Sequence, residues 1–298
     1  MRAAAIFGPG SSINDLKPFQ KGSAVTWLTG LPSTSTDADA ILILGGDGTV
    51  HRHLSQLVEL QLPVLIVPCG SGNDFARALG LGSVRDSLAA WRKFCSGRGN
   101  AQAIDLGVIT PMLDRHGAGE ASAPHPHYFC CVSGVGLDGD VARRANHLPR
   151  WLRAHGGYVL SFLPALWRFA PIAMKISVAR AEGPDAFIAR TAKPLVVAAF
   201  ANAPAYGGGM KIAPRARFDD GALDVCIVPD MSKFKLCCFF PTVYFGRHLS
   251  VPGVEYFQTE RLRLETETPF EVYADGEYVC RTPIEVSVAR GALPLIRP

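Results

Sequence analysis

The first third of the chain alternates fully apolar runs with a run in which apolar residues recur at helical spacing. Three runs are typical of strands buried on both faces: residues 3–7 (AAAIF), 40–45 (AILILG) and 63–68 (PVLIVP). Between the second and the third, a helix with one apolar face is expected from Val50, Leu54, Leu57 and Val58. Strand, helix and strand in this order predict a parallel sheet.

From about residue 104 the pattern changes to short β-rich runs, such as AMKISVAR, PLVVAAFA and FEVYA, separated by Gly, Pro and Asp-Gly turns. This pattern is typical of an antiparallel sandwich or barrel. One helical stretch is expected around residues 151–170, and residues 111–127 are expected to form an exposed loop. The chain is therefore predicted to hold an α/β domain followed by a mainly β domain.

The composition provides enough apolar residues for two cores and excludes some classes of protein. Of the 298 residues, 48% are hydrophobic and 19% are charged, which is too apolar for a disordered chain. The net charge of +4 is too small for a nucleic-acid footprint, although it favours anionic substrates or membranes. The eight cysteines show no C-x-x-C spacing, and no run of about 18 apolar residues occurs. We expect a cytoplasmic protein with reduced thiols and neither a secretion signal nor a membrane span.

A glycine-rich loop follows the second strand, with the sequence Gly45-Gly46-Asp47-Gly48-Thr49. Glycines let backbone N–H groups approach a phosphate, and the helix that follows adds a positive N-terminal dipole. Asp47 cannot bind phosphate directly, because like charges repel. A metal ion or the attacking hydroxyl group is therefore the more suitable partner for its carboxylate. The alternative is an ordinary turn between a strand and a helix.

A second glycine loop, PCGSGNDFAR (residues 68–77), follows the third strand and again opens a helix. Loops after neighbouring parallel strands lie side by side at the carboxyl edge of the sheet, where ligands bind in open α/β folds. Helix capping by Asn73 would alone explain the Asn-Asp pair. We prefer a nucleotide site shared by both loops.

The segment GVGLDG (residues 134–139) matches the dinucleotide pattern G-x-G-x-x-G. Its context is β-rich, and no acidic residue follows about 20 positions later, as that fingerprint requires. We therefore do not expect a dinucleotide site there.

Two acidic turns occur in the β-rich part of the chain. In Asp219-Asp220-Gly221, Asp220 and neighbouring carbonyl groups would suit Mg²⁺. In Asp275-Gly276-Glu277, two carboxylates are expected to project from a hairpin and could take a proton from an alcohol or bind Mg²⁺. Asp-Gly also favours plain hairpin turns, so a purely structural role remains open for both.

Two aromatic-rich segments, residues 157–170 and 233–248, remain, and the second is flanked by Lys233, Lys235, Arg247 and His248. An apolar face with basic flanks is typical of proteins that contact an anionic membrane. Core packing of a helix and an acyl-chain pocket are the alternatives.

Together, the motifs GGDGTV, PCGSGNDFAR, Asp105-Leu106-Gly107, GVGLDGDV, YGGGMKIAP with DDGALDV, and the terminal DGE resemble the diacylglycerol kinase catalytic-domain family in their order. That family includes bacterial lipid kinases and the sphingosine and ceramide kinases. The resemblance covers nearly the whole chain. It implies a Rossmann-like α/β nucleotide-binding domain over 1–104, to which 288–298 return. It also implies a β-sandwich domain over 105–287 that binds lipid and metal, with the active site in the cleft between the domains.

The resemblance further implies transfer of the γ-phosphoryl group of ATP, with Mg²⁺, to a lipid hydroxyl at a membrane surface. It assigns catalysis to Asp47, Asp275 and Glu277. It assigns nucleotide binding to Gly45, Gly46, Asp47, Gly48, Thr49, Gly70, Ser71 and Asn73. A structural metal ion would be bound by Asp220 and the carbonyls of Arg217 and Ala222. Because no P-loop lysine occurs, we also expect Arg77 or Lys211 to help neutralise the phosphates.

Two alternatives remain open. The first is an NAD kinase, because NAD kinases share GGDGT, but this function leaves the YGGGMKIAP and DGE segments unexplained. A non-catalytic nucleotide- or lipid-binding regulator is the other, and the intact acidic residues argue against it. The sequence predicts neither which lipid is phosphorylated nor an oligomeric state.

Overall fold

The computed structural model describes residues 1–21, 24–112, 125–148, 157–180 and 186–298, so most of the loop expected at 111–127 lies outside the described residues. The chain forms two compact units, Met1–Leu106 with Arg290–Pro298, and Gly107–Ala289. It passes from one unit to the other within strands β5 (Ala101–Pro111) and β15 (Ile284–Ile296). The expected bounds at 104 and 288 fall in the same two strands. The cleft expected between the domains stays a prediction.

The first unit contains a parallel sheet in the order β2-β1-β3-β4, and the end of β15 adds to β4 through Leu295 and Val64. The strands are β1 (Arg2–Phe7), β2 (Thr26–Thr29), β3 (Ala40–Gly45) and β4 (Val64–Pro68). Every residue of β3 is buried, as its unbroken apolar sequence requires. Three of the four main strands were predicted; β2 is a short, mostly exposed edge strand and has no apolar pattern.

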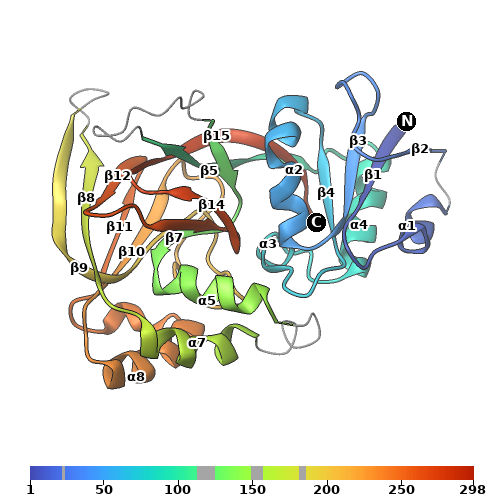
Figure 1. The fold of residues 1–298 in the computed structure, drawn as a ribbon. Helices are drawn as coiled ribbons and strands as arrows, with labels where there is room; N and C mark the ends of the chain where they lie inside the picture. Colours follow the sequence, from blue (N-terminus) through green and yellow to red (C-terminus); the bar gives the residue numbers. More distant parts are fainter. Residues whose placement is uncertain (22–23, 113–124, 149–156, 181–185) are drawn as a thin grey trace. The chain divides into compact units, whose positions relative to one another are not determined.

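Helices cover both faces of this sheet (Figure 1). They are α1 (Ile13–Gln20), α2 (Asp47–Leu60), α3 (Asp74–Ala78) and α4 (Val84–Cys95). The connection from β1 leads to β2, and the connection from β3 leads to β4, in the opposite direction along the sheet. Because such connections are right-handed, α1 and α2 lie on opposite faces. Helix α2 buries the predicted Val50, Leu54 and Leu57.

The second unit is antiparallel, and its core lies between packed strands, as expected for a β-sandwich. Besides parts of β5 and β15, its strands are β6 (His127–Phe129), β7 (Val132–Gly136), β8 (Ile172–Ala179), β9 (Phe187–Ala201), β10 (Leu223–Pro229), β11 (Glu255–Thr259), β12 (Arg261–Thr266), β13 (Glu271–Ala274) and β14 (Glu277–Arg281). Strand β9 is central, because it pairs with β7, β8 and β10.

Helices also belong to the second unit: α5 (Leu137–Asn146), α7 (Gly157–Arg168), α8 (Lys233–Tyr244) and the 3-10 turn η1 (Arg247–Ser250). GVGLDG lies in the expected β-rich unit, but it also contains the start of a helix, because β7 ends at Gly136 and α5 begins at once. Strand β7 is antiparallel to both neighbours, so the segment is no βαβ unit. None of the described helices is long and apolar enough to cross a membrane.

Candidate functional site

The two predicted glycine loops meet at the carboxyl edge of the parallel sheet, after the neighbouring strands β3 and β4. A Cβ atom on Gly70 would lie 2.4 Å from the Cα of Gly46, so the two backbones touch where only glycine fits. The N-cap residue of α2 is Gly46, which offers no side-chain cap to the first turn of the helix. This arrangement suits an anion such as a phosphate.

Asp47 joins the two loops. Its Oδ2 accepts a hydrogen bond from the backbone N–H of Asp74 at 3.0 Å, and its Oδ1 accepts one from Phe75 at 3.0 Å. The carboxylate of the first loop therefore caps helix α3 of the second, which also complements the positive end of that helix.

Asn73 does not cap α3 with its side chain, which corrects the capping alternative considered from the sequence. Its backbone is left-handed, with φ of 58°, and its side chain turns back to the loop. There Oδ1 accepts from the N–H of Gly70 at 2.9 Å, and Nδ2 donates to the carbonyl of Gly70 at 2.8 Å. Asn73 thus fixes the shape of the glycine loop, while Ser71 at its tip is exposed.

A third loop, Gly8 to Ser12 after β1, lies at the same edge, and no role was expected for it from the sequence. The N–H of Gly8 donates to the carbonyl of Leu44 at 2.8 Å, and Ser11 Oγ donates to the same carbonyl. A Cβ on Gly8 would lie 2.3 Å from Oγ1 of the buried Thr49. The sequence feature that could have pointed to this loop is the run GPGSS directly after an apolar strand.

The cation expected to neutralise phosphates in this unit, Arg77, is already paired. Its guanidinium donates to Oδ1 of the buried Asp74 at 2.6 Å. The other candidate, Lys211, is an exposed residue of the second unit.

In the second unit, Asp275 and Gly276 form the tight turn of the β13–β14 hairpin, with φ of 51° and 87°. The Asp275 carboxylate points back into the unit, where it accepts hydrogen bonds from the N–H groups of Cys130 and Cys131, both at 2.8 Å, and of Val132 at 3.3 Å. The expectation that both carboxylates project from the turn was therefore wrong for Asp275. Glu277 is exposed, and no described side chain pairs with its carboxylate.

Asp220 and its predicted partners Arg217 and Ala222 lie in one turn before β10. Asp220 Oδ1 accepts from the N–H of Ala222 at 3.2 Å, and Oδ2 accepts from Gln258 at 3.0 Å. Carboxylate and carbonyl oxygens match Mg²⁺ in chemistry, so this donor set fits the ion. Among the described residues, however, no group of three His, Cys, Asp or Glu side chains could hold a metal. Asp220 as a ligand stays a prediction.

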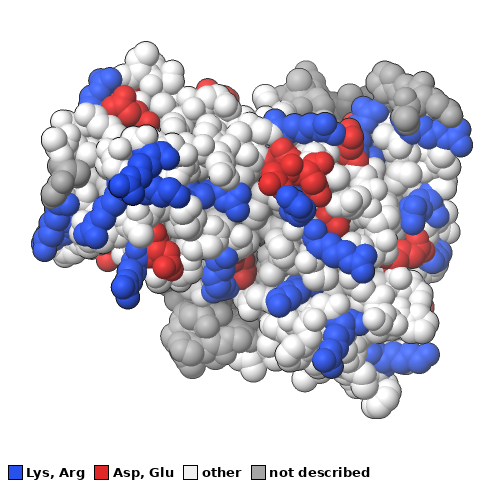
Figure 2. Space-filling model, turned by 180° about the vertical axis from the view of Figure 1, so that it is seen from behind, with Lys and Arg blue, Asp and Glu red and all other residues white. Residues whose placement is uncertain are grey.

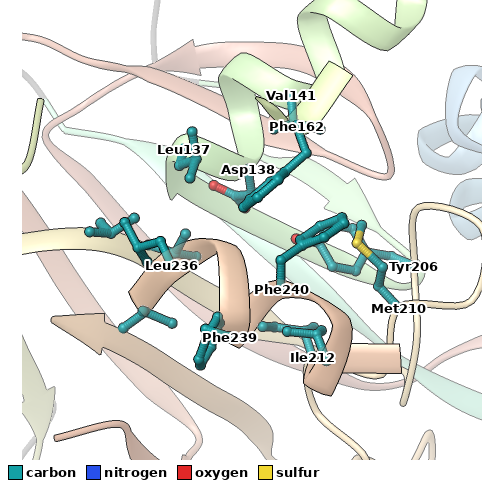
Figure 3. Close-up of a pocket in the computed structure, with 14 residues that line it drawn as sticks. Leu137, Asp138, Val141, Phe162, Tyr206, Met210, Ile212, Leu236, Phe239 and Phe240 are labelled. Carbon is teal, nitrogen blue, oxygen red and sulfur yellow. The ribbon is translucent and has the colours of Figure 1, made fainter. Parts of the chain in front are cut away.

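An apolar pocket lies within the second unit (Figure 3); its cavity volume is about 60 Å³, within a space of about 570 Å³ that includes open solvent. Its walls come from α5, α7, α8, β9 and β10 and from the segment around Tyr206 and Met210. Phe162 of α7 stacks on Phe240 of α8, with ring centroids 3.8 Å apart. The one acidic residue in the lining is Asp138 of α5. From the sequence, no role was expected for Asp138, because GVGLDG was not expected to form a dinucleotide site.

Comparison with known proteins agrees with these features. Residues 16–109 match the family described as the diacylglycerol kinase catalytic domain, and residues 130–297 match the YegS C-terminal NAD kinase beta sandwich-like domain. A diacylglycerol kinase of Mycobacterium tuberculosis is 33% identical over 260 residues, which make up 87% of this chain and 77% of that protein.

Solved structures share the fold. A diacylglycerol kinase structure from Bacillus anthracis has a TM-score of 0.66 at 18% identity and covers 100% of this chain and 97% of its own. An NAD kinase from Archaeoglobus fulgidus, in complex with ATP, has a TM-score of 0.52 at 14% identity, covering 99% and 92%. At such identities these similarities establish the fold alone.

Proposed function

Because the chain belongs to the diacylglycerol kinase family of lipid kinases, we propose that it transfers the γ-phosphoryl group of Mg-ATP to the hydroxyl of diacylglycerol or a related lipid. The observation that carries this proposal is the pair of glycine loops in the first unit. Their backbones touch at Gly46 and Gly70, Asp47 joins them, and helix α2 begins beside them with a glycine at its N-cap. A rigid edge that presents N–H groups suits a triphosphate.

The residues of the first unit would bind and orient the nucleotide. Phosphoryl transfer needs little covalent help from a protein, because alignment and charge neutralisation supply most of the acceleration. Backbone N–H groups of the loops would contact the phosphate oxygens, and Asp47 would hold the two loops in register. Arg77 contributes less than its charge suggests, since Asp74 already neutralises it.

Glu277 is the base in this proposal, and Asp275 positions it. As the bond between the lipid oxygen and the γ-phosphorus forms, the bond to the oxygen bridging the β-phosphate breaks, and ADP leaves. The proton of the lipid hydroxyl passes to the Glu277 carboxylate, which is exposed and unpaired among the described side chains. Mg²⁺ would neutralise phosphate charge, and a structural ion would be held by Asp220 with the carbonyls of Arg217 and Ala222.

A membrane-contact surface would bring this enzyme to its lipid. On α7, Leu160, Leu163 and Trp167 share one face and are 54%, 56% and 73% exposed. On α8, Phe234 is 78% exposed, and the neighbouring Lys233 donates to carbonyls at the end of α7, so the two helices form one surface. In Figure 2 the region of α7 and α8, at the lower right, carries Lys and Arg and almost no Asp or Glu. Apolar side chains among cations suit an anionic bilayer.

Vesicle binding tests this surface. The double variant Trp167→Ala with Phe234→Ser should lose at least about tenfold in affinity for vesicles that contain anionic phospholipid. The matched control replaces the exposed Val84 and Ile13 of the first unit by Ala and Ser. Equal vesicle binding by both double variants would remove the surface from the proposal.

We also propose that the protein works in the cytoplasm. All eight of its cysteines are free, although Cys130 and Cys131 are adjacent in the sequence, as are Cys237 and Cys238. Reduced thiols are the rule in that compartment.

A kinase assay with Mg-ATP and alternative acceptors tests the proposed function. Diacylglycerol, monoacylglycerol and NAD are offered separately, and the products are identified by mass spectrometry. We expect phosphorylated lipid, and at least about a hundredfold loss of turnover in Glu277→Gln. Glu267→Gln, which replaces another exposed glutamate of the same unit, should retain full turnover. Phosphorylated NAD without phosphorylated lipid would replace the proposal by the NAD kinase alternative.

A further inference from the structure

The outer face of helix α8 is apolar and exposed. Its inner face lines the apolar pocket described above. On the outer face, exposed residues recur at helical spacing: Phe234, Cys238, Pro241 and the C-cap residue Phe245. The exposed fractions of Phe234 and Phe245 are 78% and 74%. A helix that is apolar on both sides is usually covered on both sides, so we expect an occupant for the outer face.

A groove lies along this outer face. One wall is α8, and the other consists of the end of β10 and the turn that follows η1. Its cavity volume is about 460 Å³, compared with about 60 Å³ for the pocket on the inner side of the helix. Ligand sites usually measure roughly 300–1,000 Å³. Among the described residues, only Phe239 lines both spaces, and this side chain is largely buried, so the groove is a separate and larger space.

Two opposite charges line the groove together with its apolar residues: Lys235 of α8 and Asp230 after β10. Both side chains are exposed, and neither forms an ion pair within the part of the chain that the structure describes. The neighbouring Lys233 differs, because it donates to carbonyl groups at the end of α7. A ligand that pairs with both free charges must carry a negative and a positive group of its own. An anionic lipid would bring a like charge to Asp230, and an uncharged lipid would leave both side chains unpaired.

We propose that this groove binds one phospholipid whose head group carries a phosphate and an ammonium group. The Lys235 ammonium donates to the phosphate, the ammonium of the lipid donates to the Asp230 carboxylate, and a hydrocarbon chain lies along α8. Lys235 and Thr242, seven residues apart on the groove side of α8, give that chain a length of about 10 Å. Such a lipid has no free hydroxyl group, so it is not the acceptor of the proposed reaction. The inference rests on the membrane contact in the proposed function, because Phe234 belongs to that surface and to the groove.

The reactivity of Cys238 locates the ligand, because its exposed thiol lines the groove. The protein is alkylated with iodoacetamide, with and without dihexanoylphosphatidylethanolamine kept below its critical micelle concentration, and mass spectrometry follows each thiol. At a lipid concentration of ten times the Kd, alkylation of Cys238 should slow about tenfold. Cys95, an exposed thiol of the first unit, is the internal control and should react at an unchanged rate.

Three probes of the same chain length test the head group, with the alkylation rate of Cys238 as the measure of binding. Dihexanoylphosphatidylethanolamine should bind about three- to fivefold more tightly than dihexanoylphosphatidylglycerol or dihexanoylglycerol, as expected for exposed ion pairs. Asp230→Asn should abolish the preference over the phosphatidylglycerol. Lys235→Gln should weaken binding of the phosphatidylethanolamine about three- to fivefold. Lys93→Gln, which replaces an exposed lysine of the first unit, should bind all three probes as the wild type does.

Unchanged alkylation of Cys238, equal slowing of Cys95, or equal binding of the three probes would each overturn the inference. A variant that fills the groove, Thr242→Phe, gives an independent check, because it should weaken binding at least about tenfold. Full binding by this variant would also overturn the inference. The outcomes separate the inference from the proposed function. Binding in the groove without phosphorylation of any lipid would contradict only the kinase proposal, and phosphorylation by a protein whose groove binds none of the probes would contradict only the inference.

Discussion

Replacement of Asp275 by Asn tests whether this carboxylate holds the β13–β14 hairpin in place. In the structure, the carboxylate accepts hydrogen bonds from the N–H groups of Cys130, Cys131 and Val132. An amide keeps one acceptor oxygen and turns an NH₂ group toward at least one of those donors. Hydrogen bonds to charged groups contribute about 1.5–3 kcal/mol each, so losing one and weakening the others should cost about 2–4 kcal/mol of unfolding free energy.

The cost should appear both globally and locally. At about 2–4 °C per kcal/mol for units of this size, the melting temperature of Asp275→Asn should fall by roughly 5–15 °C. Hydrogen exchange measured by mass spectrometry should accelerate in the peptide that contains Cys130–Val132. Glu277→Gln is the matched control, because its exposed side chain has no partner among the described residues, and it should melt as the wild type does. An unchanged melting temperature and unchanged exchange in Asp275→Asn would refute the reasoning, and so would equal destabilisation by Glu277→Gln.

Three further predictions concern the loops and the pocket. Asp47→Asn should lower the free energy of unfolding by about 1–2 kcal/mol in urea denaturation, since it weakens the cap of α3; an unchanged midpoint would contradict this. Gly70→Ala should weaken ATP binding at least about tenfold in titration calorimetry, because its Cβ would lie 2.4 Å from the facing backbone. Gly82→Ala, whose Cβ would make only an ordinary contact with Asp86 at 3.9 Å, should not. The folded state holds the proton of Asp138 up to about pH 7, so the free energy of unfolding should fall by about 2 kcal/mol between about pH 5.5 and 8.5. This pH dependence should diminish in Asp138→Asn. Equal pH dependence in the wild type and the variant would contradict the prediction.

The sequence predicted those elements whose pattern is decided locally. Strands β3 and β4 are buried on both faces, and their unbroken apolar runs locate them within one residue. The meeting of the two glycine loops also followed, because loops after neighbouring parallel strands must lie at one edge. The edge strand β2 was missed, since three of its four residues are exposed and only Trp27 packs inward, against Trp91.

The direction of individual side chains could not be predicted. An Asp-Gly pair predicts the hairpin turn at Asp275, but the segment between β6 and β7 that supplies N–H groups to its carboxylate lies more than a hundred residues earlier. Asp47 likewise caps a helix that starts 27 residues later. The G-x-G-x-x-G match around Asp138 was rejected from the sequence alone, and the antiparallel pairing of β7 agrees with that rejection.

The central claim is that this chain phosphorylates a lipid hydroxyl, and one measurement tests it most directly. Purified protein is incubated with Mg-ATP and vesicles made from a native bacterial lipid extract, and the lipids are compared by mass spectrometry with a reaction that contains Glu277→Gln. The account predicts one class of uncharged lipid that gains a phosphate group with the wild type and gains almost none with the variant. Formation of ADP without any phosphorylated lipid, or equal products from both proteins, would contradict it.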